Sequence, residues 1–295
     1  MSDANNFQIW LLAARPKTLP AGAVPVLVGG ALAWETGVFH LPALLLALAG
    51  SLLIQIGTNF VNDLCDCLKN VDDAERIGPL RVTQAGLVTP GRMKRACFFV
   101  FGLALLCGGY LVYRGGVPIL IVGVASILCG VLYTAGPRPI GYLGLGEIFV
   151  LIFYGPVAVC GTYYVITLDV PPVVLLASLS PGLLATAILA VNNLRDLDND
   201  RRTGKRTLAV RFGRTFARGE YIALVVGALL LPLLLLRWGD GHPWLALTLF
   251  AMIPAIPLVR RVVTSTEGPV LNDALAATGR LLVLFGLLFC AGWLL

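Results

Sequence analysis

The chain has 295 residues, of which 58% are hydrophobic and 13% are charged, and its mean hydropathy is +0.86. This composition excludes an ordinary soluble globular domain, and the recurring apolar stretches of roughly 17 to 25 residues are long enough to cross a bilayer as helices. The formal net charge is +6. In an all-α integral membrane protein, this excess of Lys and Arg indicates topology and not affinity for nucleic acid.

Nine apolar segments predict nine transmembrane helices, within a single transmembrane domain over residues 1–295. Turn-forming residues separate most of them, and two longer connections, 62–95 and 193–218, follow the second and sixth segments. The predicted spans are 19–35, 41–61, 96–114, 117–134, 146–166, 172–192, 219–237, 243–263 and 272–294.

A polar cluster begins directly after the second span. Asn62, Asp66 and Asn70 recur every four residues, with Asp63 and Asp72 beside them. If the helix continues past residue 61, side chains at this spacing stack on one face. Carboxylate and carboxamide oxygens are ligands for hard divalent cations such as Mg2+, which proteins hold by one or two carboxylates together with substrate phosphates.

The same spacing returns after the sixth span, in Asn192, Asp196 and Asp200. A helix C-terminus is the negative end of its dipole, so carboxylates there are disfavoured unless a cation compensates them. Two such clusters therefore indicate metal ions and one polyanion held between them. Basic residues that follow the clusters are candidates for binding the phosphate oxygens; they are Lys69, Arg76, Arg81, Lys205 and Arg206.

The distribution of Lys and Arg predicts the orientation. With a cytoplasmic N-terminus, nineteen of them fall on the inner side and only Arg114 and Arg237 in outer loops. This bias favours a cytoplasmic N-terminus and places both clusters on the cytoplasmic face. The two halves also form a weak repeat, because each has an entry span, a span ending in Asn-x-x-x-Asp, a long basic connection and two more spans.

Together these residues resemble the membrane-embedded aromatic prenyltransferases of the UbiA superfamily. The finer resemblance is to the branch that prenylates 1,4-dihydroxy-2-naphthoate in menaquinone synthesis. This sequence differs from many superfamily members at residue 70, where they have Asp and it has Asn. In the naphthoate branch Asp72 is expected to serve as the third metal ligand in its place, so Asn70 and Asp72 are alternative third ligands of the first site. The matching residues are 14–20, 62–66 with Asp72, 76–81, 133–147, 161–164 and 192–208.

The resemblance implies nine helices around a central cavity that opens to the cytoplasm and to the lipid. It also implies that Mg2+ bridges the two Asp motifs to a polyprenyl diphosphate, whose tail lies in the membrane. An allylic cation is then attacked by the aromatic ring, and the acceptor carboxylate leaves as CO2. The implied catalytic residues are Asp66, Asp72, Asp196 and Asp200, joined as metal ligands by Asn62 and Asn192, with Arg138, Tyr133, Tyr142 and Tyr154 binding the acceptor.

Two other functions remain open from the sequence. The same chemistry could serve another acceptor, such as 4-hydroxybenzoate, homogentisate or a haem precursor. A cation-coupled transporter with a site between repeats is a different class, and it requires acidic residues in the middle of the spans. In this chain the carboxylates gather at the predicted cytoplasmic ends, in a multi-pass protein expected in a bacterial inner membrane.

Overall fold

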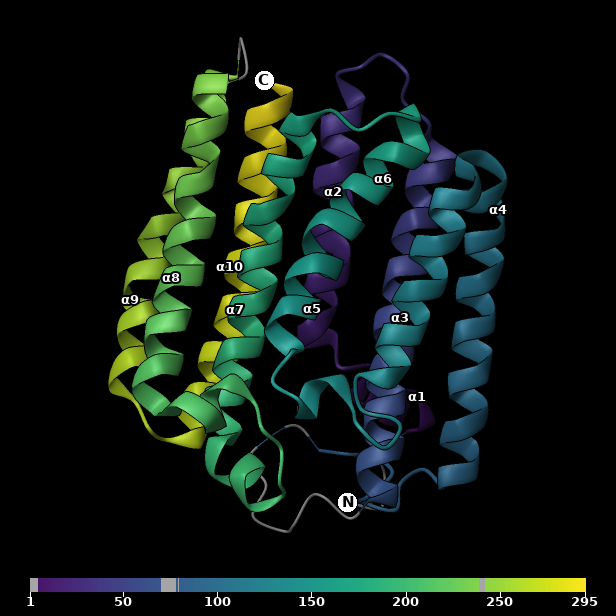
Figure 1. Ribbon diagram of the computed structural model, residues 1–295, viewed down its shortest axis with the longest axis vertical. Coiled ribbons are helices and arrows are strands. Elements are labelled where there is room, and N and C mark those ends of the chain that lie inside the picture. Colours follow the sequence, from purple (N-terminus) through teal and green to yellow (C-terminus); the bar gives the residue numbers. More distant parts are fainter. Residues whose placement is uncertain (1–4, 70–77, 79, 239–241) are drawn as a thin grey trace.

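The computed structural model describes residues 5–69, 78, 80–238 and 242–295, and every regular element within these ranges is a helix (Figure 1). The elements are α1 (Asn6–Ala14), η1 (Pro16–Thr18), α2 (Leu19–Trp34), α3 (Leu41–Leu68), α4 (Pro90–Leu132), η2 (Ile140–Tyr142), α5 (Gly146–Ile152), η3 (Phe153–Val157), α6 (Ala158–Thr167), α7 (Pro172–Arg202), α8 (Leu208–Trp238), η4 (Pro243–Ala251), α9 (Met252–Thr264) and α10 (Gly268–Leu294).

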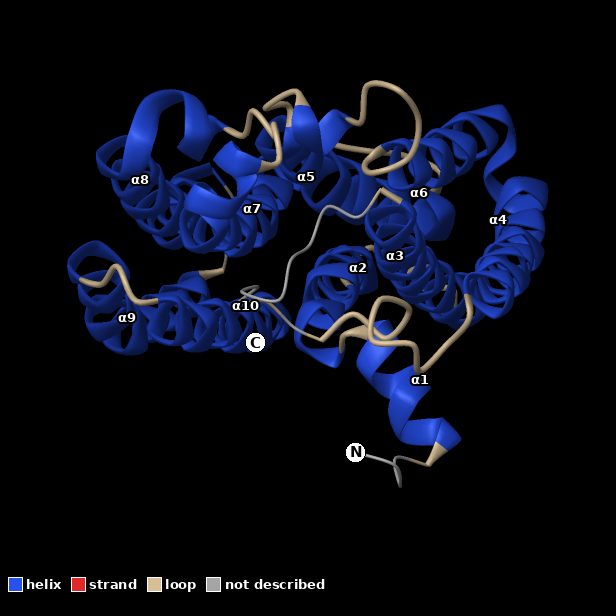
Figure 2. Cartoon of the chain, turned by 90° about the horizontal axis from the view of Figure 1, so that it is seen from below, coloured by secondary structure: helices blue, strands red, loops and turns tan. Residues whose placement is uncertain are grey.

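The long helices run beside one another along the long axis of the molecule (Figure 1). Seen end-on, α7 to α10 gather on one side and α2, α3, α4 and α6 on the other (Figure 2). Among the described residues, seven helical stretches are long and apolar enough to cross a membrane. The protein is therefore a multi-pass membrane protein, as its composition indicates. The exact count of nine spans stays a prediction, because α2 has only 16 residues.

Helix α4 contains two antiparallel segments, as the sequence predicts for residues 96–114 and 117–134. The chain reverses at Gly116, whose φ of 69° lies in the left-handed region that glycine adopts at little cost. Phe101 packs on Gly57 of α3, and Gly130 lies against the adjacent Thr58. Residues on both sides of the reversal therefore contact the same part of α3.

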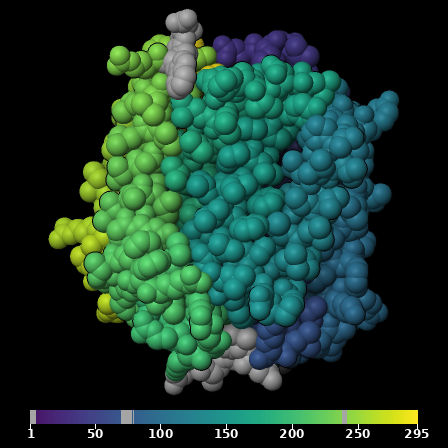
Figure 3. All heavy atoms as spheres, viewed as in Figure 1, coloured from purple at the N-terminus to yellow at the C-terminus, as the bar shows by residue number. Residues whose placement is uncertain are grey.

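In the space-filling view, α4 to α8 form one continuous face (Figure 3).

Both helices that carry the polar clusters extend beyond the apolar segments. Helix α3 ends at Leu68 and α7 ends at Arg202, so the two long connections are shorter than the sequence indicates. Hydropathy identifies only the part of a helix that lies in lipid. The helix can continue beyond it, because its backbone groups form the same helical hydrogen bonds in water. The helical continuation places Asn62 and Asp66 on one face of α3, and Asn192 and Asp196 on one face of α7.

One irregular turn lies where the bundle wall meets the cavity. Between α5 and α6 the chain forms a turn of π-helix, η3, which contains Pro156. Gly155 of this turn packs closely on α7, because a Cβ on Gly182 would lie only 2.9 Å from the Cα of Gly155. Small residues allow such close approach of helix backbones in membranes. The π-turn is thereby held against α7, with Tyr154 on it.

The orientation in the membrane gives the first testable prediction. The ends of α3 and α7 that carry the polar clusters lie at the same end of the bundle as helix α1, and the loop between α2 and α3 lies at the other end (Figure 1). In a cysteine-free background, we expect Thr89→Cys to react with an impermeant thiol reagent only after the inner face is opened. Thr36→Cys should react in intact cells. Both positions are exposed, and the reverse labelling pattern would overturn the predicted topology.

Candidate active site

The first cluster is built at the C-terminal end of α3. The carboxylate of Asp63 accepts the backbone N–H groups of Val82 and Thr83, both at 3.0 Å. Asp63 therefore fixes the chain that returns after the loop. The Asp66 side chain is only 1% exposed and pairs with Arg81. Burial of a carboxylate without such a partner would be costly, so the ion pair with Arg81 explains how the Asp66 side chain is accommodated at this buried helix end.

Arg81 joins the two motif residues of α3. Its Nη1 donates to the backbone oxygen and to Oδ1 of Asn62, at 2.9 and 2.8 Å, and its Nη2 forms the ion pair with Asp66. Arg81 also lines the central cavity. It is thus placed to neutralise anionic charge from α3 and from any ligand that enters the cavity between the clusters.

The second cluster, on α7, has the same arrangement. Arg195 donates through Nε and Nη2 to the two oxygens of Asp196, at 2.8 and 2.7 Å, and through Nη2 to Oδ1 of Asn192, at 2.9 Å. Its Nη1 donates to Oδ1 of Asn272 on α10, at 3.0 Å. Each Asn-x-x-x-Asp motif is therefore held by one buried arginine, although Arg195 lies within its motif and Arg81 lies in the segment after α3.

Asp200 lies one turn beyond Asp196 and is 4% exposed. Lys205 approaches it with Nζ at 3.6 Å from Oδ1, and the backbone N–H of Lys205 donates to the Asp200 carbonyl at 2.9 Å. The chain after α7 thus folds back so that a cation meets the last carboxylate of the cluster.

Tyr142 connects the two clusters. Its hydroxyl donates to Oδ1 of Asp66 at 3.3 Å, and its carbonyl accepts the N–H of Arg206 at 3.0 Å. The ammonium groups of Lys69 and Lys205 lie 5.0 and 5.2 Å from the centre of its ring, within the range of cation–π attraction. One residue of the loop between α4 and α5 therefore contacts the ends of both α3 and α7.

Burial, followed by the negative charge of the neighbouring Asp66, raises the pKa of the Tyr142 phenol well above its ordinary value. The hydroxyl therefore stays protonated at physiological pH and acts as a donor to Asp66. A protonated phenol adds no negative charge to the cluster, so the positive charges of Lys69 and Lys205 are not offset by Tyr142.

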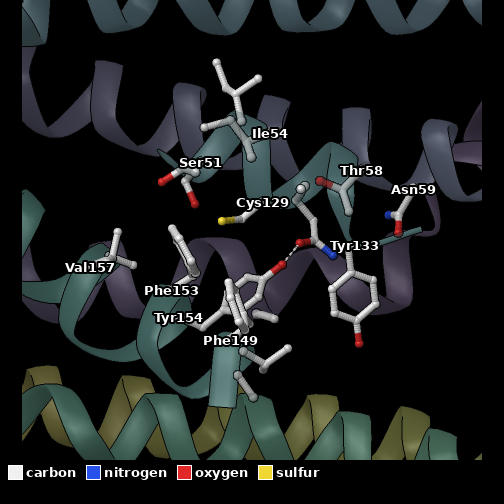
Figure 4. A pocket seen from close by; sticks show the side chains of 18 of the residues that line it. Ser51, Ile54, Thr58, Asn59, Cys129, Tyr133, Phe149, Phe153, Tyr154 and Val157 are labelled. Carbon is white, nitrogen blue, oxygen red and sulfur yellow. Dashed lines mark hydrogen bonds between the residues drawn. The ribbon is translucent and has the colours of Figure 1, made fainter. Parts of the chain in front are cut away.

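A cavity of about 620 Å3 runs from the clusters into the bundle. Its polar end is formed by Asn62 and Arg81 from the first half and by Asn192, Asp196 and Asp200 from the second. Deeper in the bundle, Phe149, Phe153 and Tyr154 face Ser51 and Thr58 of α3 across the cavity (Figure 4). The space combines an ionic end with a mostly apolar interior, as a ligand with an anionic head and an apolar body requires.

The residues at the polar end fit Mg2+. The described residues contain no group of three His, Cys, Asp or Glu side chains that could by itself enclose an ion. Each cluster instead offers one or two carboxylates with a carboxamide, all oxygen donors. Mg2+ is commonly held in this way, with water and substrate phosphates completing its octahedron.

The structure brings most of the predicted site residues together, but not all of them. Asp66 and Lys69 contact Tyr142, which itself lines the cavity. Arg138 and Arg206 are exposed, and neither lines the cavity. Asp72, Arg76 and Asn70 lie outside the described residues. The predicted residues that line the cavity are Asn62, Arg81, Tyr133, Tyr142, Tyr154, Asn192, Asp196, Asp200 and Lys205.

Sequence reasoning missed several residues of this site. From the sequence, Arg195 was included only among the Lys and Arg residues that indicate the cytoplasmic side. Its position next to Asp196, within the motif, was a signal that it belongs to the site. Gln55 and Asn59 lie on α3 and line the cavity; polar residues inside an apolar span are functional candidates by default. Glu147, 6% exposed, accepts from Nδ2 of the cavity residue Asn193 at 2.7 Å. Arg15 also lines the cavity.

Solved structures share this architecture. A UbiA homolog from Archaeoglobus fulgidus, bound to DMAPP and Mg2+, superposes with a TM-score of 0.65 over 95% of this chain and 98% of its own, at 15% identity. The apo structure of a UbiA homolog from Aeropyrum pernix K1 gives 0.71 over 92% and 97%, at 14% identity. At these identities, the likeness shows the fold.

Sequence relatives are considerably closer. A 1,4-dihydroxy-2-naphthoate octaprenyltransferase from Escherichia coli strain K12 is 39% identical over 97% of this chain and 94% of its own length. The protein of that name from Mycobacterium tuberculosis strain H37Rv is 36% identical over 96% and 95%. The model of the UbiA prenyltransferase family matches residues 23–274. The chain therefore belongs to the UbiA prenyltransferase family.

Proposed function

We propose that this protein transfers a polyprenyl group from a polyprenyl diphosphate to 1,4-dihydroxy-2-naphthoate, with loss of CO2, in a bacterial inner membrane. The product is a demethylmenaquinol. The relatives named for this reaction align over nearly the whole chain. The observation that carries the proposal is the pair of Asn-x-x-x-Asp faces, each held by a buried arginine, at the ionic end of an otherwise apolar cavity.

The reaction balances with the groups at this site. The allylic C–O bond breaks and diphosphate leaves with the electron pair, a C–C bond forms to the aromatic ring, and the ring loses its carboxylate as CO2. Mg2+, when bound, neutralises charge on the diphosphate and on the clustered carboxylates. Arg81 and Lys205 face the same space and stabilise the negative charge that grows on the leaving group.

The remaining predicted roles belong to this proposal as well. Asp66, Asp72, Asp196 and Asp200 are the proposed catalytic carboxylates, and Lys69, Arg76 and Arg206 add positive charge near the diphosphate. Tyr133 and Tyr154 line the cavity where an allylic cation would form. The acceptor roles of Arg138 and Tyr142 stay predictions; Arg138 is exposed, and the ring of Tyr142 is occupied by two lysines.

The position of the charges also separates an enzyme from a transporter. Among the described residues, Asp196 and Asp200 are the only acidic side chains that line the cavity, and both lie at its polar end. The deeper polar residues, such as Gln55, are uncharged. A transport site in the middle of the membrane would need a carboxylate there to couple a cation, so the arrangement favours prenyl transfer.

The test is an activity measurement on the purified protein with Mg2+ and farnesyl diphosphate. A panel of aromatic acids is offered, and products are identified by mass. We expect a decarboxylated, prenylated product from 1,4-dihydroxy-2-naphthoate that disappears in EDTA. Prenylation of 4-hydroxybenzoate or homogentisate in its place would move the protein to another acceptor, and absence of any transfer would contradict the enzyme assignment.

Tyr142 provides a prediction about the diphosphate. Replacement by leucine removes the ring beneath Lys69 and Lys205, and loss of the two cation–π contacts together is expected to cost about 0.5–2 kcal/mol at this partly exposed ring. We expect Tyr142→Leu to raise the KM for farnesyl diphosphate about 2- to 30-fold. Tyr142→Phe keeps the ring and loses only the hydroxyl bond to Asp66, so its KM should stay within about threefold. Equal KM values for the two variants would contradict a role of the ring.

A further inference from the structure

A stripe of uncharged polar side chains continues from the first cluster into the membrane. Ser51, Gln55, Asn59 and Asn62 recur every three or four residues on α3, and all four line the cavity. Side chains at this spacing share one face of a helix. Gln55 lies seven positions before Asn62, about 10 Å farther along the helix axis. This stripe was not expected from the hydropathy of the span.

The amide of Gln55 is held in one orientation. It is 9% exposed, its Oε1 accepts from the Tyr154 hydroxyl, and its Nε2 donates to Oγ1 of Thr18 at 3.3 Å. Thr18 is fixed in turn, since it donates to the carbonyl of Arg15 at 2.9 Å. An amide oxygen accepts two hydrogen bonds and an amide nitrogen donates two. Each atom of the Gln55 amide therefore keeps one further bonding position.

The other walls of the cavity differ on the two sides of this amide. Phe149, Phe153 and Tyr154 from the α5–η3 segment present flat rings (Figure 4). The α4 side presents aliphatic residues, among them Leu105, Leu111, Val112, Ile119 and Leu120. A prenyl tail has no hydrogen-bonding group, so the aliphatic wall suits it. A hydroxylated aromatic ring suits the side that combines flat rings with an oriented amide.

The two substrates must also meet below the clusters. Reacting carbons have to approach to about 3–3.5 Å, so the acceptor ring has to bind next to the allylic carbon that carries the diphosphate, in the same cavity. Gln55 lines the same cavity as Asn62, about 10 Å farther along α3 into the bundle, where a ring bound inward of the diphosphate can reach it. The π-turn η3 places Tyr154 there, and π-bulges are frequent at functional sites.

We infer that Gln55, held by Tyr154 and Thr18, hydrogen-bonds a ring hydroxyl of the aromatic acceptor and thereby determines which acceptors are accepted. The inference rests on the proposed function and deepens it by naming the residue that discriminates. It assigns recognition of the ring to the interior of the bundle and not to the cytoplasmic loop that carries Arg138.

The test compares acceptors that differ by one hydroxyl group. The purified protein is assayed with Mg2+, farnesyl diphosphate and 1,4-dihydroxy-2-naphthoate, while 1-hydroxy-2-naphthoate and 4-hydroxy-2-naphthoate are measured as competitive inhibitors. A site built to hydrogen-bond a substrate hydroxyl discriminates against the analogue that lacks it. In the wild type, one of the two analogues should bind about 5- to 100-fold more weakly than the dihydroxy acid, and the other should bind nearly as well.

In Gln55→Leu, we expect the KM for the dihydroxy acid to rise about 5- to 100-fold, while the inhibition constant of the weaker analogue changes less than about twofold. The KM for farnesyl diphosphate should not change. The matched control is Thr248→Val, which alters a buried polar side chain that does not line the cavity and that donates to the Leu245 carbonyl of its own helix at 2.7 Å. It should leave all constants unchanged.

Several outcomes would overturn the inference. One is an equal loss of affinity for the dihydroxy acid and both analogues, and another is a rise confined to the diphosphate KM; each would make Gln55 a structural residue. If the leucine variant does not purify as a monodisperse protein, Gln55→Met carries the same comparison, because it keeps the length of the side chain and removes both the amide oxygen and the N–H donor. If the wild-type protein does not prenylate 1,4-dihydroxy-2-naphthoate, the proposed function itself is wrong. This outcome is observed in the wild-type assay, before any variant is made.

Discussion

Asp196→Ala is expected to reduce kcat/KM for prenyl transfer by about 150- to 5,000-fold, equivalent to about 3–5 kcal/mol. Asp196 lines the cavity and faces the space between the clusters. Its removal takes away a proposed metal ligand and leaves the diphosphate charge less compensated. Asp66→Ala should cause a loss of the same order, because Asp66 has the same place in its Asn-x-x-x-Asp motif and contacts the cavity residues Arg81 and Tyr142.

The chain offers a matched control two residues away. Asp198 is on the same helix, but its side chain is 69% exposed and pairs with Arg214 at 2.5 Å. Asp198→Ala should therefore retain nearly full activity. The measurement is product formation at varied Mg2+ with each purified variant. A similar loss in Asp198→Ala, or full wild-type activity in EDTA, would show that the carboxylates act through general charge or folding and not as metal ligands.

Loss of Arg195 is expected to lower the stability of the protein strongly, because it breaks a buried ion pair from one side. Arg195 is 1% exposed and its partner Asp196 is 16% exposed. Arg195→Met keeps the volume and removes the charge, which leaves the Asp196 carboxylate and the Asn272 amide without their donor. Breaking a buried pair from one side costs about 3–5 kcal/mol, and we expect that decrease in the free energy of unfolding.

A double-mutant cycle separates this cause from simple loss of packing. Arg195→Met combined with Asp196→Asn removes the uncompensated carboxylate, so the double variant should be more stable than Arg195→Met alone, although both lack activity. Arg214→Met, at the exposed pair with Asp198, should cost no more than about 1 kcal/mol. Denaturant titration in detergent measures all of them. A double variant less stable than the single variant would contradict the buried-charge explanation.

The parts of the site that could be read from the sequence are those encoded locally. Hydropathy located the spans, because each helix in lipid must satisfy its backbone within itself and show an apolar surface. The four-residue spacing predicts that Asn62 and Asp66 share one helix face, and that Asn192 and Asp196 share another, provided that the helices continue through these residues. Helices α3 and α7 do continue through them. The resemblance carried by residues 14–20, 133–147 and 192–208 indicated the family, which the comparisons confirm.

Only the tertiary structure could decide which side chains from distant segments meet. Arg81 and Arg138 are both basic residues that the sequence assigns to the site, yet Arg81 pairs with Asp66 and Arg138 is exposed. Tyr142 joins Lys69 to Lys205 because the loop between α4 and α5 passes between the ends of α3 and α7. The path of a loop and the rotation of a helix follow from packing across the whole bundle. The spacing of residues within a short motif carries no information about that packing.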